Sequence, residues 1–343
     1  MVSIADVAAR AGVSPTTVSH ALSGKRKVSA DVQARVLAAV NELGYTPGRS
    51  AQSLASGRTL ILGLIVPDIG NGYFAELAQG VEQSATLGGY NVLLCTTGFD
   101  YEREKHALAM IRSRAVDGVV YAAGAPPSNS ELARLLGDLP LVLVDEEVPG
   151  TGATAFVSDN REGGRLAAQH LLDLGHRSVL VMEANEKLVS SRERVSGFSE
   201  VWAAAGVPEP RIVSGGFTHE GGRIAAEPHG RAFAAGEITA LFAANDLMAL
   251  GAIDHLNAIG VETPRDVSVV GFDDIASTRY VRPRLTTVRQ NVAELGRSAV
   301  AALVAALDQG DGLDGERHVY PVELVVRDST SAPRPESARR EAR

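Results

Sequence analysis

The chain has 343 residues, which is too long for one compact core and predicts two or three domains. Its one cysteine, Cys95, excludes a disulfide framework and a cysteine-based metal site within the chain, and no run approaches the roughly 18 apolar residues of a membrane span. The N-terminus lacks a signal-peptide pattern. The net charge is −8, but residues 1–58 carry +4 and the remainder −12, which orients the N-terminal part toward a polyanion.

Residues 3–22 carry the pattern of two short helices joined by a tight turn. Ser3 is a good helix N-cap, and Asp6 stands three residues later, as in a capping box. Gly12 ends the first helix, because glycine adopts a positive φ without strain, and Ser14 caps the second. The stretch therefore predicts a helix-turn-helix whose second helix has a polar outer face.

That outer face offers hydrogen-bonding side chains, which the major groove of DNA accommodates. We expect His20 to be the leading reader of base edges, Thr16 and Thr17 to be further readers, and the following basic turn to meet phosphates. The alternative is an ordinary helical hairpin with a solvated polar face. The candidate DNA-binding residues of this region are Ser14, Thr16, Thr17, Ser19, His20, Lys25 and Arg26.

A third helix is predicted from Ser29 to Gly44, with its valines on one face. Three short helices of this kind can close a small core, which makes residues 1–47 the predicted headpiece. Residues 48–58 follow as a linker. Its segment 49–55 is about two helical turns long, and isolated helices below about 12–15 residues are marginal in water. This segment is therefore expected to fold only against a partner.

From Leu60 onward, apolar β-rich runs alternate with amphipathic helices. This alternation is typical of parallel sheets covered by helices on both faces. The predicted fold class is a small all-α helix-turn-helix headpiece followed by an α/β core. Buried parallel strands are predicted at 60–66, 91–96, 118–122, 141–145, 178–182, 240–243 and 267–272. Helices are predicted at 74–87, 160–174, 191–205, 246–259 and 292–308.

Several motifs resemble those of the lactose/galactose repressor (LacI/GalR) family, over nearly the whole chain. The head carries DVAxxAGVSxxTVSxxL at 6–22, and the linker resembles YxPNxxAxxL at 45–54. The resemblance implies a periplasmic-binding-protein-like core of two doubly wound subdomains with a ligand cleft between them. It also implies a homodimer. The later motifs are RVSGF at 194–198, NDLMALG at 245–251 and VSVVGFDD at 267–274.

In this arrangement the effector-binding and dimerisation core spans 59–330, and the chain crosses between its subdomains near Asp159, Thr287 and Pro321. The tail at 331–343 is rich in Pro, Ser, Arg and Glu and is expected to be disordered. It lacks the Leu heptads of a tetramerising coiled coil. The expected N-subdomain comprises about 59–158 and 288–320, and the C-subdomain about 159–287 and 321–330.

The resemblance also assigns a role to the linker as a hinge helix. In the family, two such helices pair across the dimer in the minor groove, and a leucine wedges between the central base pairs. The hinge residues expected to contact DNA in this sequence are Arg49, Ala51 and Leu54. Gly48 departs from the usual Asn of the family, and the loss of a capping side chain is expected to weaken the hinge helix.

Ligands of open α/β sheets bind beyond the carboxyl ends of the strands, and polar and aromatic side chains follow the predicted strands here. Asp145 and Asp273 suit hydroxyl groups of a ligand. Phe74 is either a wall of the cleft or a core residue, and Arg194 is either a ligand contact or part of a structural salt bridge. The candidate effector-binding residues are Asn71, Tyr73, Phe74, Asp100, Asp145, Arg194, Phe217, Asn245 and Asp273.

Four acidic neighbours of these residues are expected to serve other purposes. Asp246 is expected to cap the helix that it begins. Asp274 is expected to be a structural acceptor. Glu146 and Glu147 are expected to be solvated.

Together these features predict a ligand-responsive, sequence-specific DNA-binding regulator, most simply a repressor that binds a palindromic operator as a homodimer. It would work in a bacterial cytoplasm, on the nucleoid when bound to DNA. The pocket polarity favours a sugar effector, and a nucleoside or purine corepressor is the alternative. An enzyme is disfavoured, because the chain has no P-loop, GxSxG or HExxH motif. A plain solute-binding protein is disfavoured as well, because it does not require a helix-turn-helix head. No catalytic residue, cofactor, metal or membrane partner is expected.

Overall fold

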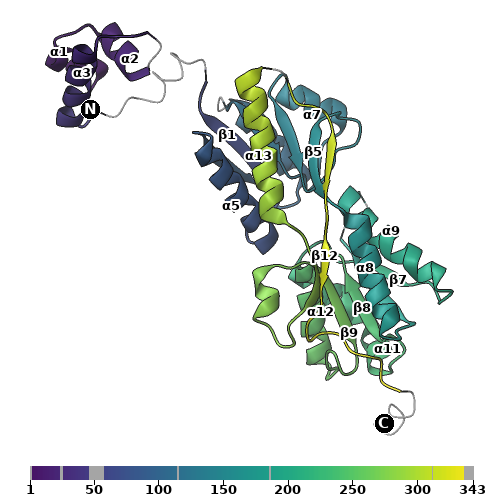
Figure 1. Cartoon of the computed structure of the whole chain (residues 1–343). Coiled ribbons are helices and arrows are strands. Elements are labelled where there is room, and N and C mark those ends of the chain that lie inside the picture. The colour runs from purple at the N-terminus through teal and green to yellow at the C-terminus, as the bar shows by residue number, and fades with distance from the viewer. Residues whose placement is uncertain are drawn as a thin grey trace.

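The computed structural model describes residues 2–23, 26–45, 58–113, 116–184, 187–310 and 312–335. In these ranges the chain forms a helical head and two α/β subdomains (Figure 1). Several predicted residues lie outside the described ranges, namely Lys25 and the hinge residues Gly48, Arg49, Ala51 and Leu54. None of the helices that the structure describes has the length and apolar character needed to cross a membrane.

The head consists of α1 (Ile4–Ala11), α2 (Pro15–Ser23) and α3 (Ala30–Leu43). The predicted capping box is confirmed: the Ser3 hydroxyl accepts from the Asp6 amide at 3.3 Å, and the Asp6 carboxylate accepts from the Ser3 amide at 2.8 Å. Gly12 ends α1 with φ of 65°. Val18 of α2 and Val36 of α3 are fully buried against α1, so the three helices share one small core.

The first subdomain contains a six-stranded sheet in the order β11-β5-β4-β3-β1-β2. All of its described strand pairs are parallel. The edge strand β2 is largely exposed, unlike the buried strand that was predicted there, because it has a neighbour on one side only. The strands are β1 (Ile61–Val66), β2 (Asn91–Thr96), β3 (Gly118–Tyr121), β4 (Leu141–Val144), β5 (Thr154–Ser158) and β11 (Arg317–Tyr320).

The second subdomain contains a six-stranded sheet in the order β12-β10-β9-β8-β6-β7. Its described strand pairs are parallel except β10 with β12, which is antiparallel. The two sheets therefore repeat one doubly wound plan, with the last strand of each supplied by the C-terminal part of the chain. The strands are β6 (Val179–Glu183), β7 (Arg211–Ser214), β8 (Ala240–Ala243), β9 (Ser268–Asp273), β10 (Thr286–Arg289) and β12 (Glu323–Val325).

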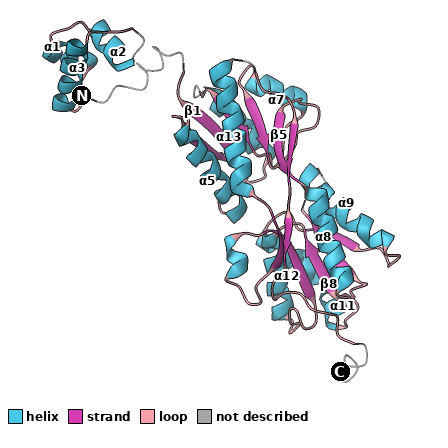
Figure 2. Ribbon diagram, viewed as in Figure 1, coloured by secondary structure: helices cyan, strands magenta, loops and turns pink. Residues whose placement is uncertain are grey.

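Helices cover both faces of each sheet (Figure 2), and each face has its own apolar cluster. This layering buries the central strands on both sides, which accounts for their nearly continuous apolar sequences. In the first subdomain the helices are α5 (Gly72–Leu87), α6 (Tyr101–Ser113), α7 (Asn129–Leu136) and α13 (Val292–Gln309). In the second they are α8 (Asn160–Asp173), α9 (Val189–Ala204), α10 (His219–Ala226), α11 (Gly230–Ala234) and α12 (Asp246–Ala258), with short 3₁₀ turns at Glu227–His229 and Ala276–Arg279.

The chain passes between the subdomains three times: after β5, after β10 and between β11 and β12. The first and third passages lie where the sequence placed them, near Asp159 and Pro321. The second lies beyond Arg289 instead of near Thr287, because β10 continues to Arg289 in the second sheet. These three chain segments run side by side and form the hinge between the two subdomains.

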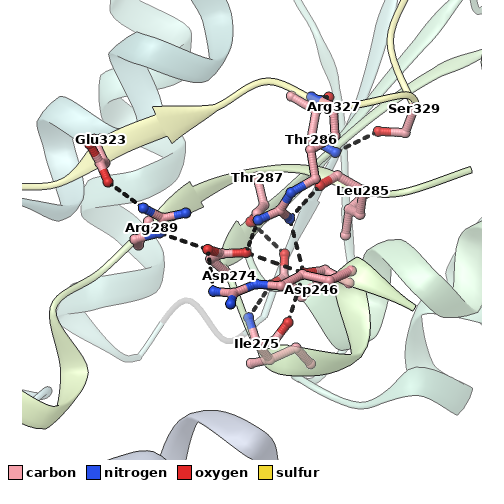
Figure 3. A network of polar contacts seen from close by, with 12 residues as sticks. Asp246, Asp274, Ile275, Leu285, Thr286, Thr287, Arg289, Glu323, Arg327 and Ser329 are labelled. Atoms are coloured by element: carbon pink, nitrogen blue, oxygen red, sulfur yellow. Dashed lines mark hydrogen bonds and ion pairs between the residues drawn. The ribbon is translucent and has the colours of Figure 1, made fainter. Parts of the chain in front are cut away.

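A buried carboxylate fixes the hinge end of the second subdomain (Figure 3). The Asp274 side chain is 1% exposed and receives ion pairs from Arg289 at 2.7 Å, Arg279 at 3.1 Å and Arg327. Burial opposes its ionisation, but hydrogen bonds from Arg289 and Arg327 keep the pKa of Asp274 below its ordinary value. Since Arg289 ends β10 and Arg327 follows β12, the carboxylate ties both crossing strands to the loop after β9.

The sequence predicts that the disordered tail begins at Ser331, but the ordered part of the chain continues past that residue. Ser331 accepts hydrogen bonds through its carbonyl oxygen from Ser268 and His176, both at 2.9 Å, and Arg334 pairs with Asp266 at 2.9 Å. These contacts extend the second subdomain to at least Arg334.

Candidate DNA interface and effector cleft

The outer face of α2 presents the polar side chains that the sequence predicted, although to different degrees. Thr16 and Ser14 are exposed, whereas Thr17, Ser19 and His20 are half-buried. The Ser14 hydroxyl accepts from the Thr17 amide at 3.1 Å and lies 2.8 Å from the Thr17 hydroxyl. These two hydroxyls thus stabilise the start of α2, and both retain lone pairs for a further partner. Arg26 is exposed beyond the end of the helix.

A cavity lies between the two subdomains, at the carboxyl ends of both sheets, where this fold places ligands. Its volume is about 20 Å³, room for about one water molecule. Eight of the nine predicted effector residues line it; Asp100 does not. The lining residues are Asn71, Tyr73, Phe74, Phe99, Ala123, Asp145 and Glu146 from the first subdomain, and Leu188, Ser190, Arg194, Phe217, Asn245 and Asp273 from the second.

Arg194 is the only cationic side chain in this lining and is 3% exposed. Its guanidinium donates to the Asn160 side chain at 2.8 Å, to the Ala244 carbonyl at 2.6 Å and to Asp273 at 3.4 Å. Its Cζ also lies 3.9 Å from the centre of the Phe272 ring, a cation–π contact. The ion pair with Asp273 confirms the structural role considered for Arg194. The ligand contact stays a prediction, which its place in the cavity lining permits.

Close packing of α8 against α9 sets the position of Arg194. A Cβ on Gly197 would collide with the Arg161 carbonyl, and one on Gly164 would collide with the Arg194 carbonyl. The two backbones thus cross directly at these glycines. This crossing explains the glycine of the RVSGF motif, and it carries the guanidinium from α9 toward the end of β9.

The carboxyl groups of the cavity are costly to ionise. Burial raises the pKa of Asp273 to about 7; Arg194 and a hydrogen bond from Gln290 oppose this shift, and Asp145 adds to it. Burial also raises the pKa of Asp145, which accepts a 2.6 Å hydrogen bond from the Tyr73 hydroxyl. Because one guanidinium faces several carboxyl groups, the site favours a ligand that donates hydrogen bonds and carries no negative charge.

Backbone strain concentrates at the cavity. Among the described residues, six that are not glycine have a positive φ, and four of them line this cavity. Such conformations are rare for bulky side chains and gather at functional sites. The four are Phe99 (56°), Asp145 (69°), Phe217 (61°) and Asp273 (112°).

Aromatic rings form an apolar wall that bridges the two subdomains. Phe99 lies 6.1 Å from Phe74 on its own side and 6.0 Å from Phe217 on the other, measured between ring centres. Phe74 is both a lining residue and part of the first subdomain's core, so both roles considered for it hold. Rings of this kind can pack against an apolar or planar face of a ligand.

Four acidic residues near the cavity lie differently from what the sequence suggested, and of these Asp100 remains a predicted effector contact. Asp100 is exposed and accepts from the Arg103 amide at 2.8 Å, so it serves the start of α6, and its neighbour Phe99 lines the cavity instead. The helix cap of α12 is Asn245, whose side chain accepts from the Met248 amide at 2.9 Å.

Asp246 is fully buried and receives hydrogen bonds from Thr287 at 2.6 Å and the Ile275 amide at 2.9 Å (Figure 3). Glu146, expected to be solvated, is 2% exposed and lines the cavity. Glu147 is half-buried and pairs with Arg317 at 2.8 Å. Four further cavity residues stand outside the sequence motifs and were not predicted: Phe99, Ala123, Leu188 and Ser190.

One group of side chains in the described ranges has metal-ligand spacing, with ligand atoms within 4.8 Å of one another: Asp314, Glu316 and His318. The two carboxylates are exposed, and the His318 ring already pairs with Asp314 at 3.1 Å. The group lies beside β11, outside the cavity lining.

Comparison with known proteins identifies the chain's relatives. Residues 3–48 match the model of bacterial regulatory proteins of the lacI family, and residues 168–330 match a periplasmic binding protein-like domain. The transcriptional repressor PurR of Photobacterium profundum is 35% identical over 335 residues, covering 96% of this chain and 98% of that protein. The chain belongs to the lacI family. It is therefore a DNA-binding transcriptional regulator and not an enzyme.

Solved structures agree with this assignment over the whole chain. The lac repressor dimer bound to operator and an anti-inducer superposes with a TM-score of 0.82 at 28% identity, covering 96% of this chain and 99% of that one. The complex of the transcriptional regulator CelR with cellobiose gives 0.70 at 29% identity, covering 96% and 100%. The expected fold class, a helix-turn-helix head with a two-subdomain α/β core, is confirmed.

Proposed function

We propose that this regulator is a repressor that binds a palindromic operator as a homodimer and responds to a sugar in the cleft between its subdomains. The observation that carries the proposal is the cavity itself, since both subdomains contribute to it and its polar groups alternate with aromatic rings. Hydroxyl groups of a sugar would donate to Asp145 and Asp273 and accept from Arg194, while a ring face packs on phenylalanine.

The cavity volume implies that effector binding moves the subdomains. Small-molecule sites usually measure about 300–1,000 Å³, far above the 20 Å³ between these side chains. A sugar therefore enters only when the subdomains separate at the hinge. Such a movement would change the geometry of the linkers that lead to the heads, and an effector that prefers one arrangement would shift operator affinity.

On the DNA side, α2 is proposed to lie in the major groove with His20 as the leading base reader and Thr16 beside it. Arg26 would contact phosphate. The hinge residues Arg49, Ala51 and Leu54, with Lys25, remain proposed contacts. The excess of positive charge in residues 1–58 supports this orientation.

A thermal-shift screen of the full chain tests the effector proposal. The panel contains cellobiose, ribose and glucose on one side and hypoxanthine, guanine and adenosine on the other. The proposal predicts that at least one sugar raises the unfolding midpoint. A response to purines alone would favour the second candidate, a purine corepressor. Two observations support that candidate: the similarity to PurR, and the tilted pair of rings at Phe99 and Phe217.

Deletion of residues 1–58 separates a regulator from a solute-binding protein. The truncated chain is expected to lose binding to an operator selected from random DNA and to keep its thermal response to the effector. Retention of DNA binding by the truncated chain would contradict the assignment of the head.

A further inference from the structure

The Glu146 side chain crosses from the first subdomain to the second. Glu146 follows β4, and its carboxylate accepts from the Val189 amide at 2.5 Å, from the Ser190 amide at 3.2 Å and from the Ser190 hydroxyl at 2.5 Å. Both partners belong to the first turn of α9 in the second subdomain. With 2% exposure, the carboxylate is enclosed between the two halves of the protein.

Helix α9 depends on this carboxylate for its cap. The residue before its first turn is Leu188, which provides no side-chain hydrogen bond. The first amides of a helix have no partner within it, and a carboxylate satisfies them while interacting favourably with the helix dipole. In most helices a residue just before the first turn supplies this cap. Here it comes from a different subdomain, so the cap exists only while the cleft is closed.

Two other contacts across the cleft are apolar. Phe99 meets Phe217 with ring centres 6.0 Å apart, and Ile275 packs into the core cluster that contains Tyr73 and Phe74. Apolar contacts tolerate small shifts, because they have no strict directional requirement. The hydrogen bonds of Glu146 are directional and are lost over about an ångström of separation.

We propose that Glu146 is a latch that holds the two subdomains closed by capping α9, and that it leaves α9 whenever the cleft opens to admit an effector. The latch has a modest net strength, since the carboxylate is buried next to Asp145. Burial and this neighbour raise the pKa of Glu146 to about 7, against the hydrogen bonds from Ser190 and Val189. Because burial opposes ionisation of the Glu146 carboxylate, opening of the cleft returns this group to water and offsets part of the free energy lost with its hydrogen bonds.

Amide hydrogen exchange on the full chain tests the latch without DNA or effector, so its outcome is independent of the proposed function. In Glu146→Ala, exchange at Val189 and Ser190 is expected to speed up about tenfold or more. Exchange is also expected to rise at Tyr73 and Ile275, whose amides lie buried at the subdomain boundary, because the cleft opens more often.

The matched control is Glu147→Ala. Glu147 is the next residue and also carries a partnered carboxylate, but its partner Arg317 belongs to the same subdomain, so exchange at the four amides should stay at the wild-type rate. Ser190→Ala removes the hydroxyl partner from the other side and is expected to act in the same direction as Glu146→Ala. It keeps the test available should the first variant fail to fold.

Faster exchange confined to the first turn of α9 would show that Glu146 is only a local cap, and this result would overturn the latch. Unchanged exchange at all four amides in both variants would overturn it as well.

Discussion

Replacing Arg194 by lysine separates the geometry of the guanidinium from its charge. The guanidinium satisfies three buried acceptors, on Asn160, Ala244 and Asp273, and lies over the Phe272 ring. A lysine ammonium keeps the positive charge, but it is a compact group that cannot reproduce the planar fork. At least two acceptors would then lose their partner in a buried setting.

The expected loss follows from those contacts. A buried acceptor without a partner costs about 1–3 kcal/mol, and a desolvated cation–π contact contributes about 1–2 kcal/mol. Arg194→Lys is therefore expected to lower the free energy of unfolding of the second subdomain by about 3–8 kcal/mol. Trp202, the one tryptophan of the chain, is fully buried in that subdomain and reports its unfolding by fluorescence.

Urea unfolding followed through Trp202 measures the change. Arg192→Lys is the matched control, because Arg192 stands on the same helix and is exposed, so its replacement should change the free energy by at most about 0.5 kcal/mol. If Arg194→Lys were as stable as the control, the network around the guanidinium would not be the structural element described here.

Three further outcomes are expected. Asp274→Asn should destabilise the second subdomain by about 3–5 kcal/mol in urea, since three arginines lose their buried partner; wild-type stability would refute this. Because the pKa of Glu146 is raised to about 7, its protonated form is favoured in the folded state, and stability falls as pH rises. Between pH 5.5 and 8 the wild type should lose about 2 kcal/mol relative to Glu146→Gln, whereas parallel pH profiles would contradict the shift. His20→Ala should reduce discrimination between operator and mismatched DNA by about 1–3 kcal/mol; equal discrimination in competition binding would exclude a base-reading role.

Most of the architecture was predictable, because it rests on local patterns. The central strands are buried on both faces and therefore form continuous apolar runs, and β1, β3, β8 and β9 lie within about a residue of the predicted bounds. Caps such as Ser3 and turns such as Gly12 are decided by neighbouring residues. These features require no knowledge of what packs against them.

The errors arose where distant segments meet. Strands β11 and β12 are short, and their residues are exposed or half-buried, so no continuous apolar run marks them. Glu146 has the sequence context of a solvated loop, and it is buried because α9 approaches from the other subdomain. Asp100 follows a strand as a ligand residue would, and in this structure its carboxylate accepts from the first turn of the next helix, so its predicted contact with an effector stays a prediction.

The site was predicted through motifs, and its chemistry required the structure. Arg194, Asn245 and Asp273 stood in recognisable motifs, whereas Phe99 and Ser190 stood in none. Sequence alone also gave no indication that the subdomains leave only a small cavity between them, and the proposal that effector entry requires hinge opening rests on this feature.

The proposed function requires that the cleft and the head are coupled. This coupling is tested most directly by measuring the affinity of the full chain for its selected operator while the sugar identified in the thermal-shift screen is titrated in. Saturating sugar is expected to change operator affinity by about fivefold or more, within the usual range of coupling between two sites. An operator affinity that stays constant while the sugar demonstrably occupies the cleft would contradict it.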